Sequence, residues 1–284
     1  MATTESQSDE DLVAKAIAGG LEELDALVRR HQAWVFNLAL RMCWRREVAE
    51  DATQEILIKA STKLNSFSGN SAFRTWLYRI AVNHLLNVRK SEMEQKAMAF
   101  TDMGTSLDGV QDEELPDPRA LPIETALLVE EAKLGCITAM LMCLDRRQRL
   151  AFILGEVFGE SSEVGAQALE VSPANFRQLL SRARHDLYQF MNEKCGLVNQ
   201  ANPCRCARKA VGFMRNGWLD PKNRQFSKDR IAAMQTMAPD HLDELQDLDR
   251  QHAALYRNQP FLAGPDLANR LREILSPSGF TADQ

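Results

Sequence analysis

The sequence has no long hydrophobic run, since none of its 284 residues lies in a stretch that approaches 18 consecutive apolar residues. A membrane-spanning helix is therefore not expected, and the polar, acidic start at 1–11 has no hydrophobic signal core. Positive charge is also not in excess, because 34 Lys and Arg face 39 Asp and Glu, for a formal net charge of −5. This balance excludes a general attraction to DNA or acidic membranes, so contact with nucleic acid requires local basic patches. We expect a cytoplasmic protein that makes no contact with a membrane.

The motifs of common enzyme classes are missing as well. The sequence contains no Gly-rich phosphate-binding loop, no His-Glu-X-X-His and no nucleophile elbow. Pairs of Asp and Glu on surface helices occur by chance, and we expect no catalytic residues and no enzyme. Cysteine is limited to six residues, which in a cytoplasmic protein would mostly be reduced thiols, with metal binding or redox sensing as the exceptions.

What the sequence does contain is helical periodicity, and we predict an all-α protein. Its 45% apolar and 26% charged residues are ordinary for a globular chain, and its length allows about two domains. Up to residue 95 no stretch has the alternating pattern of a strand. Apolar residues instead recur at three- and four-residue spacing, which predicts helices over 8–19, 21–44, 47–65 and 71–90, with a loop at 66–70.

The stretch 71–90 is the most informative one. On a helical period it has an apolar stripe of Phe73, Trp76, Leu77, Ile80, Ala81, Leu85 and Val88. Cations and amides cover the remaining surface, at Arg74, Arg79, Asn83, Asn87, Arg89 and Lys90. Such a helix packs on its own domain and still presents groups that bind a polyanion, while aromatic rings nearby provide stacking for unpaired bases. The stripe alone equally fits an ordinary amphipathic core helix.

Helical periodicity fades between residues 96 and 122. Six acidic residues lie there among glycines and prolines, at Asp102, Asp108, Asp112, Glu113, Glu114 and Asp117. The composition predicts an extended acidic linker, and a passive spacer is its simplest interpretation.

A helix-turn-helix layout is predicted within 123–191. A short helix around 162–169 and a turn at 170–172 precede a last helix that Ser172 caps and Pro173 opens. That last helix displays the polar and cationic side chains of Asn175, Arg177, Gln178, Ser181, Arg182, Arg184 and His185. Such a face suits contact with duplex DNA, although helical hairpins with a cationic helix also occur in proteins that never bind DNA.

The last third, 192–284, begins with a cysteine-containing segment and continues with helical candidates near 205–217, 226–239, 241–258 and 265–275. We expect these helices to form one small domain. Cys195, Cys204 and Cys206 are candidate ligands for zinc or copper, or partners in a redox-sensitive disulfide. A structural zinc site needs four ligands, and no histidine between His185 and His241 completes one locally. Reduced structural cysteines are the simpler interpretation, and no other cofactor is expected.

Three motifs together resemble one family. Residues 73–83, Phe-Arg-Thr-Trp-Leu-Tyr-Arg-Ile-Ala-Val-Asn, residues 49–55, Ala-Glu-Asp-Ala-Thr-Gln-Glu, and the helix at 172–184 are similar to those of bacterial RNA polymerase sigma factors of the extracytoplasmic-function (ECF) type. The resemblance covers 10–95 and 125–190. It implies an N-terminal sigma domain at 8–95, the linker at 96–122, a helix-turn-helix domain at 123–191 and an additional C-terminal extension at 192–284.

The resemblance also implies roles for individual residues. Core RNA polymerase, through its beta-prime and beta subunits, would be bound by Asp51, Gln54, Glu55 and Lys59. Melted minus-ten promoter DNA would be met by Phe67, Ser68, Gly69, Asn70, Trp76, Tyr78, Arg79 and Asn83, although the sequence leaves open whether Trp76 serves the core instead. Duplex minus-thirty-five DNA would be read by Asn175, Arg177, Gln178, Ser181, Arg182 and Arg184.

The family further implies that the acidic linker runs through the polymerase cleft, that the extension regulates the factor, and that an anti-sigma protein is a partner to consider. Leu179 stands where the family usually has a cation, so the promoter sequence cannot be read from this helix. Two other classes remain open: a helix-turn-helix regulator that binds duplex DNA without polymerase, and a metal- or thiol-responsive regulatory protein. The first leaves the helix at 73–90 unexplained, and the second leaves the cationic helix at 173–184 without a role.

Overall fold

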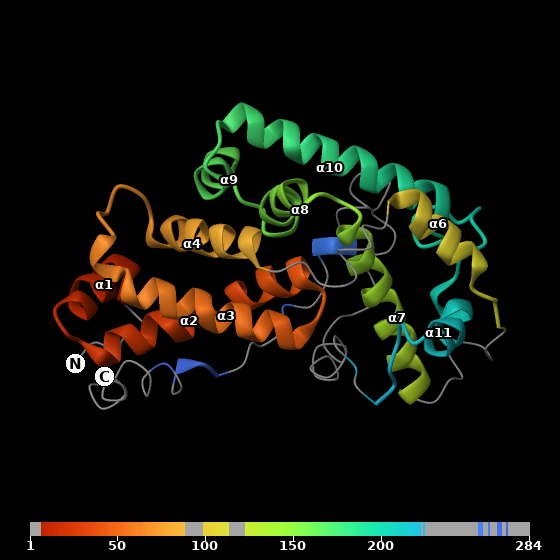
Figure 1. The fold of residues 1–284 in the computed structure, drawn as a ribbon, viewed down its shortest axis with the longest axis horizontal. Coiled ribbons are helices and arrows are strands. Elements are labelled where there is room, and N and C mark those ends of the chain that lie inside the picture. Colours follow the sequence, from red (N-terminus) through yellow and green to blue (C-terminus); the bar gives the residue numbers. More distant parts are fainter. Residues whose placement is uncertain are drawn as a thin grey trace. The chain divides into compact units, whose positions relative to one another are not determined.

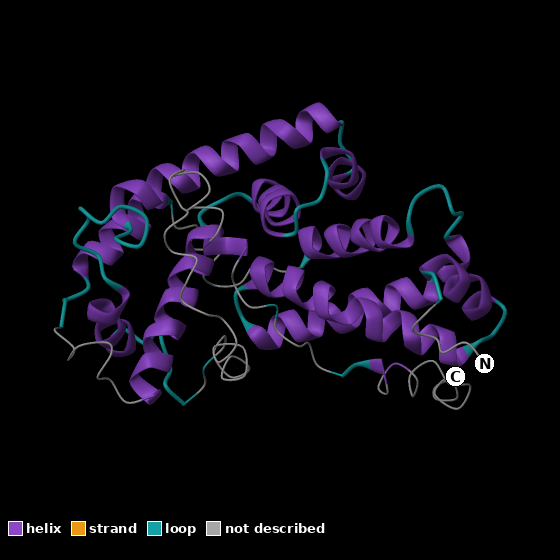
Figure 2. Ribbon diagram, turned by 180° about the vertical axis from the view of Figure 1, so that it is seen from behind, coloured by secondary structure: helices purple, strands orange, loops and turns teal. Residues whose placement is uncertain are grey.

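The computed structural model describes residues 7–88, 99–113, 123–222, 224, 255–257, 261, 266–268 and 271. Within these residues the protein is all-α, as predicted, and has helices and loops but no strand (Figures 1 and 2). None of the described helices is long and apolar enough to cross a membrane. The predicted helix at 226–239 and most of those at 241–258 and 265–275 lie outside the described residues, as do Arg89 and Lys90.

Contacts divide the chain into two compact units. The first is formed by Met1–Arg89, Ser162–Pro173 and Phe261–Gln284, and the second by Lys90–Ser161 and Ala174–Pro260. The first unit therefore contains the predicted N-terminal domain, and the second contains most of the predicted helix-turn-helix domain together with the start of the extension.

The first unit consists of α1 (Asp9–Ile17), α2 (Leu21–Cys43), α3 (Arg46–Thr62) and α4 (Phe73–Asn87), joined by α9 (Ser162–Leu169). The long helices α2 and α3 lie side by side, and α4 packs on both of them and on α9 (Figure 1). Ser8 caps α1, because its Oγ accepts the backbone N–H of Asp11 at 3.1 Å. These helices closely match the ones predicted from periodicity.

Helix α4 buries a wider surface than its predicted stripe. Phe73 and Leu77 are buried in the core as expected. Tyr78 and Val82, outside the stripe, are fully buried as well, because α4 has neighbours on more than one side. The ring of Tyr78 packs against that of Trp34 on α2, with centroids 4.5 Å apart.

The second unit contains α6 (Phe100–Gly109), α7 (Ile123–Met142), α8 (Arg146–Phe152), a π-helical turn η4 (Ile153–Val157), α10 (Pro173–Lys194) and α11 (Cys206–Arg215). Asp145 and Gln148 form a capping box at the start of α8. The π turn brings its backbone close to α10, since a Cβ atom on Gly155 would lie 2.7 Å from Cδ2 of Leu180. The helix that carries the predicted duplex-reading residues is thus packed directly on α8 and η4.

The linker is not extended throughout, which corrects the prediction for this segment. Residues Phe100–Gly109 form α6, and Met103 and Leu107 on it are buried. Its acidic and glycine-rich composition obscured an apolar face at three- and four-residue spacing, which packs through Phe100 against Phe190 of α10 at 5.2 Å between ring centroids. Part of the linker therefore belongs to the core of the second unit.

Candidate nucleic-acid interface

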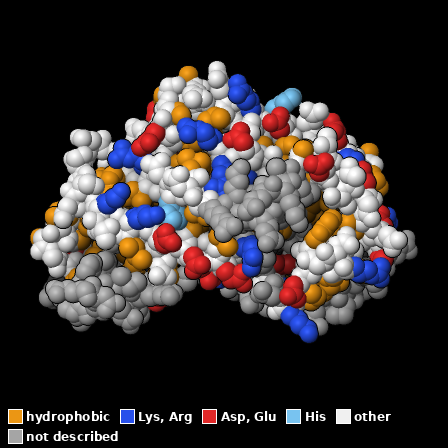
Figure 3. Space-filling model, in the orientation of Figure 1, with side chains coloured by type: hydrophobic (Ala, Val, Ile, Leu, Met, Phe, Trp, Pro, Cys, Tyr) orange, Lys and Arg blue, Asp and Glu red, His pale blue; other side chains and the backbone are white. Residues whose placement is uncertain are grey.

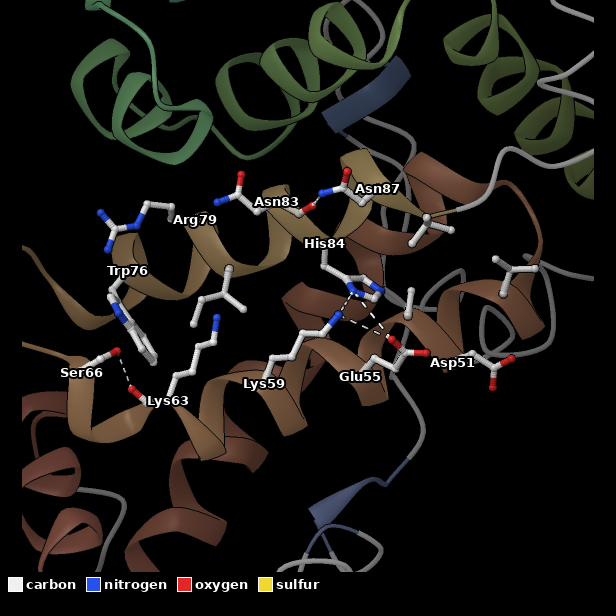
Figure 4. A pocket seen from close by; sticks show the side chains of 14 residues that line it. Asp51, Glu55, Lys59, Lys63, Ser66, Trp76, Arg79, Asn83, His84 and Asn87 are labelled. Carbon is white, nitrogen blue, oxygen red and sulfur yellow. Dashed lines mark hydrogen bonds and ion pairs between the residues drawn. The ribbon is translucent and has the colours of Figure 1, made fainter.

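A groove of about 710 Å³ lies between α3 and α4 in the first unit (Figure 4). It brings together side chains for which the sequence predicts two different roles. Asp51, Glu55 and Lys59 line it from α3, and Trp76, Arg79 and Asn83 line it from α4. Figure 3 shows basic side chains and a histidine beside acidic ones over these two helices. The two predicted surfaces of this unit are therefore continuous.

Polar contacts fix the side chains across the groove. Lys59 and His84 point toward one another, with Nζ of Lys59 donating to Nδ1 of His84 at 2.7 Å (Figure 4). Glu55 lies 3.6 Å from Nζ of Lys59 and 3.8 Å from the His84 ring. Burial and then the Lys59 charge lower the pKa of His84 below its ordinary value of 6.5, whereas Glu55 raises it. The imidazole therefore stays neutral near pH 7 and accepts from Lys59.

Along α4 the predicted DNA-contacting residues separate by exposure. Arg79 and Asn83 are exposed, whereas Trp76 has 6% of its surface exposed and Tyr78 has none. Two guanidinium nitrogens of Arg74 donate to the Tyr78 hydroxyl, at 3.2 and 2.9 Å. The Tyr78 ring therefore has no face available to a base, and Trp76 belongs mainly to the core. Arg79 and Asn83 are the members of the predicted set on α4 that a ligand reaches.

The loop before α4 is packed on aromatic rings at its base and exposed at its tip. Phe67 is half-buried, and its ring meets those of Phe73 and Trp76 at centroid distances of 5.7 Å each. Ser68, Gly69 and Asn70 are exposed, and the Asn70 amide donates to Oγ of Ser68 at 2.9 Å. Gly69 has φ +73°, a conformation that favours glycine. The loop thus presents hydroxyl, backbone and amide groups on a rigid aromatic base.

On α3 the predicted docking residues form an accessible row. Asp51, Glu55 and Lys59 are exposed at one-turn intervals, and Gln54 beside them is half-buried. Opposite-sign charges at this spacing give a mixed polar surface that suits a protein partner better than a uniform polyanion.

The second unit presents most of the predicted duplex-reading face on α10. Five residues of that face are exposed as predicted: Asn175, Arg177, Gln178, Ser181 and Arg182. Phe176, Leu180 and Ala183 are buried beneath them. Side chains alternate between packing and solvent on the helical period, which leaves one polar and cationic stripe on the surface.

Arg184 differs from the other residues of that stripe. It is half-buried, and its Nε donates to Oε2 of Glu156 at 2.5 Å. The second carboxylate oxygen of Glu156 pairs with Arg257, whose Nε also donates to the Glu156 carbonyl at 2.7 Å. The Nε of Arg184 is therefore paired with a buried carboxylate, while 43% of its side chain stays exposed.

Three cysteines lie between the end of α10 and the start of α11, and α11 packs on α7, which carries Cys136. Cys195 follows α10 and forms an isolated backbone bridge with Cys204, and Cys206 begins α11. All six cysteines of the chain are free thiols. No three His, Cys, Asp or Glu side chains of the described part of the chain are already arranged to hold a metal ion.

Sequence reasoning missed several residues that the structure places at these sites. Lys63 and His84 line the groove, and periodicity alone could have placed Lys63 one turn beyond Lys59. Glu156 and Arg257 are distant from Arg184 in the sequence, so no local pattern joins them. Cys136 on α7 likewise lies far from the C-terminal cysteines in sequence, although a count of cysteines points to it as a possible fourth member.

Comparison with known proteins matches two separate stretches of the chain. Residues 27–94 match the model of Sigma-70 region 2, and residues 134–187 match that of Sigma-70 region 4. The chain is 30% identical over 180 residues to the RNA polymerase sigma-H factor of Pseudomonas aeruginosa, a match that covers 63% of this chain and 91% of that protein. It is 31% identical over 185 residues to the ECF RNA polymerase sigma-E factor of Escherichia coli, covering 64% and 93%.

Among solved structures, CnrH in complex with the cytosolic domain of CnrY aligns with a TM-score of 0.48 and 20% identity, over 66% of this chain and 99% of that chain. The extension at 192–284 lies outside both family models. From its two sigma regions and its relatives, the chain belongs to the ECF RNA polymerase sigma factors.

Proposed function

We propose that this protein binds core RNA polymerase, directs it to a specific promoter and helps to melt the start region. The observation that carries this proposal is the pair of sigma regions in one chain, each with its predicted contact surface largely exposed. A sigma factor is a DNA-binding initiation factor, and this one would catalyse no reaction itself. Its place would be the cytoplasm, where core polymerase and promoter DNA are found.

In this proposal the α3 row of Asp51, Glu55 and Lys59, with Gln54, docks on the beta-prime subunit. The exposed mixture of both charges supports a protein partner at this face. Lys59 is held by His84 and Glu55, so its ammonium is positioned before the partner arrives. Preorganisation of this kind reduces the entropy that docking would otherwise cost.

Melted minus-ten DNA would lie against the α4 side of the same unit. The exposed Arg79 offers charge to phosphates and Asn83 offers an amide to a base edge, while the tip of the loop at Ser68–Asn70 receives a base drawn from the stack. Unstacking a base costs a few kcal/mol, which hydrogen bonds to its exposed edge can offset. Tyr78 and Trp76 would support this surface from within the core.

Duplex minus-thirty-five DNA would be read by the exposed stripe of α10. Arg177, Gln178 and Arg182 carry the groups that pair with base edges and phosphates, and Asn175 and Ser181 flank them. Arg184 would act through Glu156 by fixing the helix. A separate anti-sigma partner stays a prediction of the sequence.

The test is transcription from a promoter recovered by selection for binding to the reconstituted holoenzyme. Core polymerase with this protein should initiate at one position, and core alone should not. Arg182→Ala should weaken initiation at least about fivefold, as the loss of one good base or phosphate contact of ~1–3 kcal/mol implies. The exposed Asn192→Ala, about 15 Å further along the same helix, is the matched control and should behave as wild type. A protein that binds a duplex operator alone and neither associates with core nor supports initiation would be a regulator of another class.

A further inference from the structure

Four cysteines of the second unit lie on segments that contact one another. Cys195 and Cys204 are joined by an isolated backbone bridge. Arg205 between Cys204 and Cys206 is extended, with φ −129° and ψ 126°, so the two flanking side chains leave the backbone on the same side. Cys206 is the first residue of α11, which packs on α7, the helix that carries Cys136.

The loop between Cys195 and Cys204 is built to keep these residues together. The guanidinium of Arg205 donates to the carbonyls of Gln200 at 2.8 Å and Cys204 at 2.9 Å, and the Asn202 amide donates to the Asn192 carbonyl at 2.9 Å. Gly196 allows the close approach, because a Cβ atom there would lie 1.9 Å from Arg205 Nη1 and 2.1 Å from the Cys204 carbonyl. A loop fixed by so many internal hydrogen bonds is a frame for the cysteines rather than a flexible tether.

The four thiols influence one another electrostatically. Burial raises the pKa of each, to about 12 at Cys206, and the neighbouring cysteines raise the pKa of Cys136, Cys204 and Cys206 further. At Cys195 backbone hydrogen bonds from Leu197 and Val198 oppose the effect of burial on the pKa.

We propose that Cys136, Cys195, Cys204 and Cys206 bind one Zn²⁺ ion in a closed, structural site. Four thiolates are the ligand set of tetrahedral structural zinc, and they leave no open position for catalysis. Binding releases four thiol protons and leaves a net charge of −2, which Lys133, Arg205 and Lys209 nearby offset against the acidic Glu130 and Asp112. In the structure the thiols are free and not arranged around one point, so binding requires the four sulfurs to move together.

The site would clip the extension to the helix-turn-helix domain. It joins α7, which lies partly in the Sigma-70 region 4 match, to the segment from Cys195 to α11, which lies beyond it. Metal occupancy would then set how firmly α11 is held. The proposal does not depend on sigma activity, since metal content is measured on the protein alone.

Metal analysis of the full-length protein, purified under reducing conditions, tests the proposal. We expect one zinc ion per chain, lost in Cys136→Ser as well as in Cys204→Ser, and retained in Cys143→Ser. Cys143 is the matched control because it lies on the same region of the chain, just past α7, and its Sγ donates to the Ala139 carbonyl instead. Retention of zinc in Cys136→Ser, or its loss in Cys143→Ser, would overturn the four-cysteine assignment.

Cobalt substitution of the wild-type protein avoids reliance on variants that fold poorly. Co²⁺ bound by four thiolates gives strong sulfur-to-metal charge-transfer bands together with tetrahedral d–d bands, and Zn²⁺ should displace it. Octahedral cobalt bands, or a wild-type protein without metal and with a Cys195–Cys204 disulfide, would each contradict the proposal.

Discussion

Replacing Glu156 by Gln probes how the extension is fastened to α10, the helix for which we propose contact with duplex DNA. The Glu156 side chain is 3% exposed, and its two carboxylate oxygens accept from Arg184 and Arg257. Gln keeps the shape and removes the charge, so both hydrogen bonds lose their ionic character and the amide nitrogen faces a guanidinium.

The magnitude follows from the exposure of the partners. A hydrogen bond to a charged group contributes about 1.5–3 kcal/mol, and two are weakened here. The arginine side chains are 43% and 51% exposed, so water screens and partly resolvates them, which places the loss near the low end. We expect Glu156→Gln to lower the free energy of opening by about 2 kcal/mol, roughly 30-fold in the opening equilibrium, and Arg257→Ala by about half as much.

Hydrogen–deuterium exchange with mass spectrometry is the assay, on peptides that cover α8, η4 and α10. Loss of protection should be concentrated there, and a double-mutant cycle of Glu156→Gln with Arg257→Ala should be non-additive. Glu193→Gln is the control, because Glu193 is exposed on α10, where it accepts from Gln189, and the change should alter the free energy of opening by less than about 0.5 kcal/mol. Equal small effects of Glu156→Gln and the control would refute the view that this carboxylate fastens the extension.

Three further outcomes are expected. Trp76→Ala should destabilise the first unit by about 3–5 kcal/mol in urea unfolding, because the ring is 6% exposed, and should reduce polymerase binding and promoter melting alike. His31 accepts from Trp34 Nε1 at 2.9 Å, and burial lowers its pKa in the folded state. As pH falls below about 6.5 the unfolded chain therefore binds a proton at His31 before the folded chain does, and the free energy of unfolding decreases. Urea unfolding followed by Trp fluorescence at pH 7.5 and 5.5 measures this decrease, and a His31→Gln variant should lose that part of it. Lys209→Met should free the linker, because Nζ of Lys209 donates to the Val110 carbonyl at 2.5 Å. Hydrogen exchange in the linker should rise by at least about fivefold, which corresponds to about 1 kcal/mol in the free energy of opening. Unchanged exchange would mean that this contact does not hold the linker.

The helices of the first unit were predictable because their signals are local. Ser8 and the glycines after it mark the ends of α1, and apolar spacing marks α2 to α4. The same periodicity could not show that Tyr78 is buried, since its burial depends on Trp34, which lies on another helix. A stripe indicates which face is apolar, whereas the number of neighbours decides how much of the remaining surface is covered.

The second unit shows the limit more clearly. Its cap at Asp145 and the exposed stripe of α10 follow from short-range patterns. The pairing of the linker acids does not follow from such patterns. Asp108 pairs with Lys194 at 2.6 Å and Asp112 pairs with Lys209 at 3.0 Å, and these contacts join segments far apart in the sequence. An acidic linker that would enter a polymerase cleft is therefore held here by cations of α10 and α11, a relation that composition alone cannot reveal.

Promoter melting is measured most directly by permanganate footprinting of complexes between core polymerase, this protein and its promoter. Unpaired thymines at the minus-ten element should react with permanganate in complexes that contain the wild-type protein. Asn83→Ala should reduce that reactivity at least about tenfold, as the loss of ~1.4 kcal/mol of contact implies, with unchanged affinity for core. The control is Asn65→Ala, which removes an exposed amide that does not line the groove, and its complexes should show the thymine reactivity of wild type. Full melting by Asn83→Ala, or a parallel loss of polymerase binding, would contradict a role for α4 in holding melted DNA.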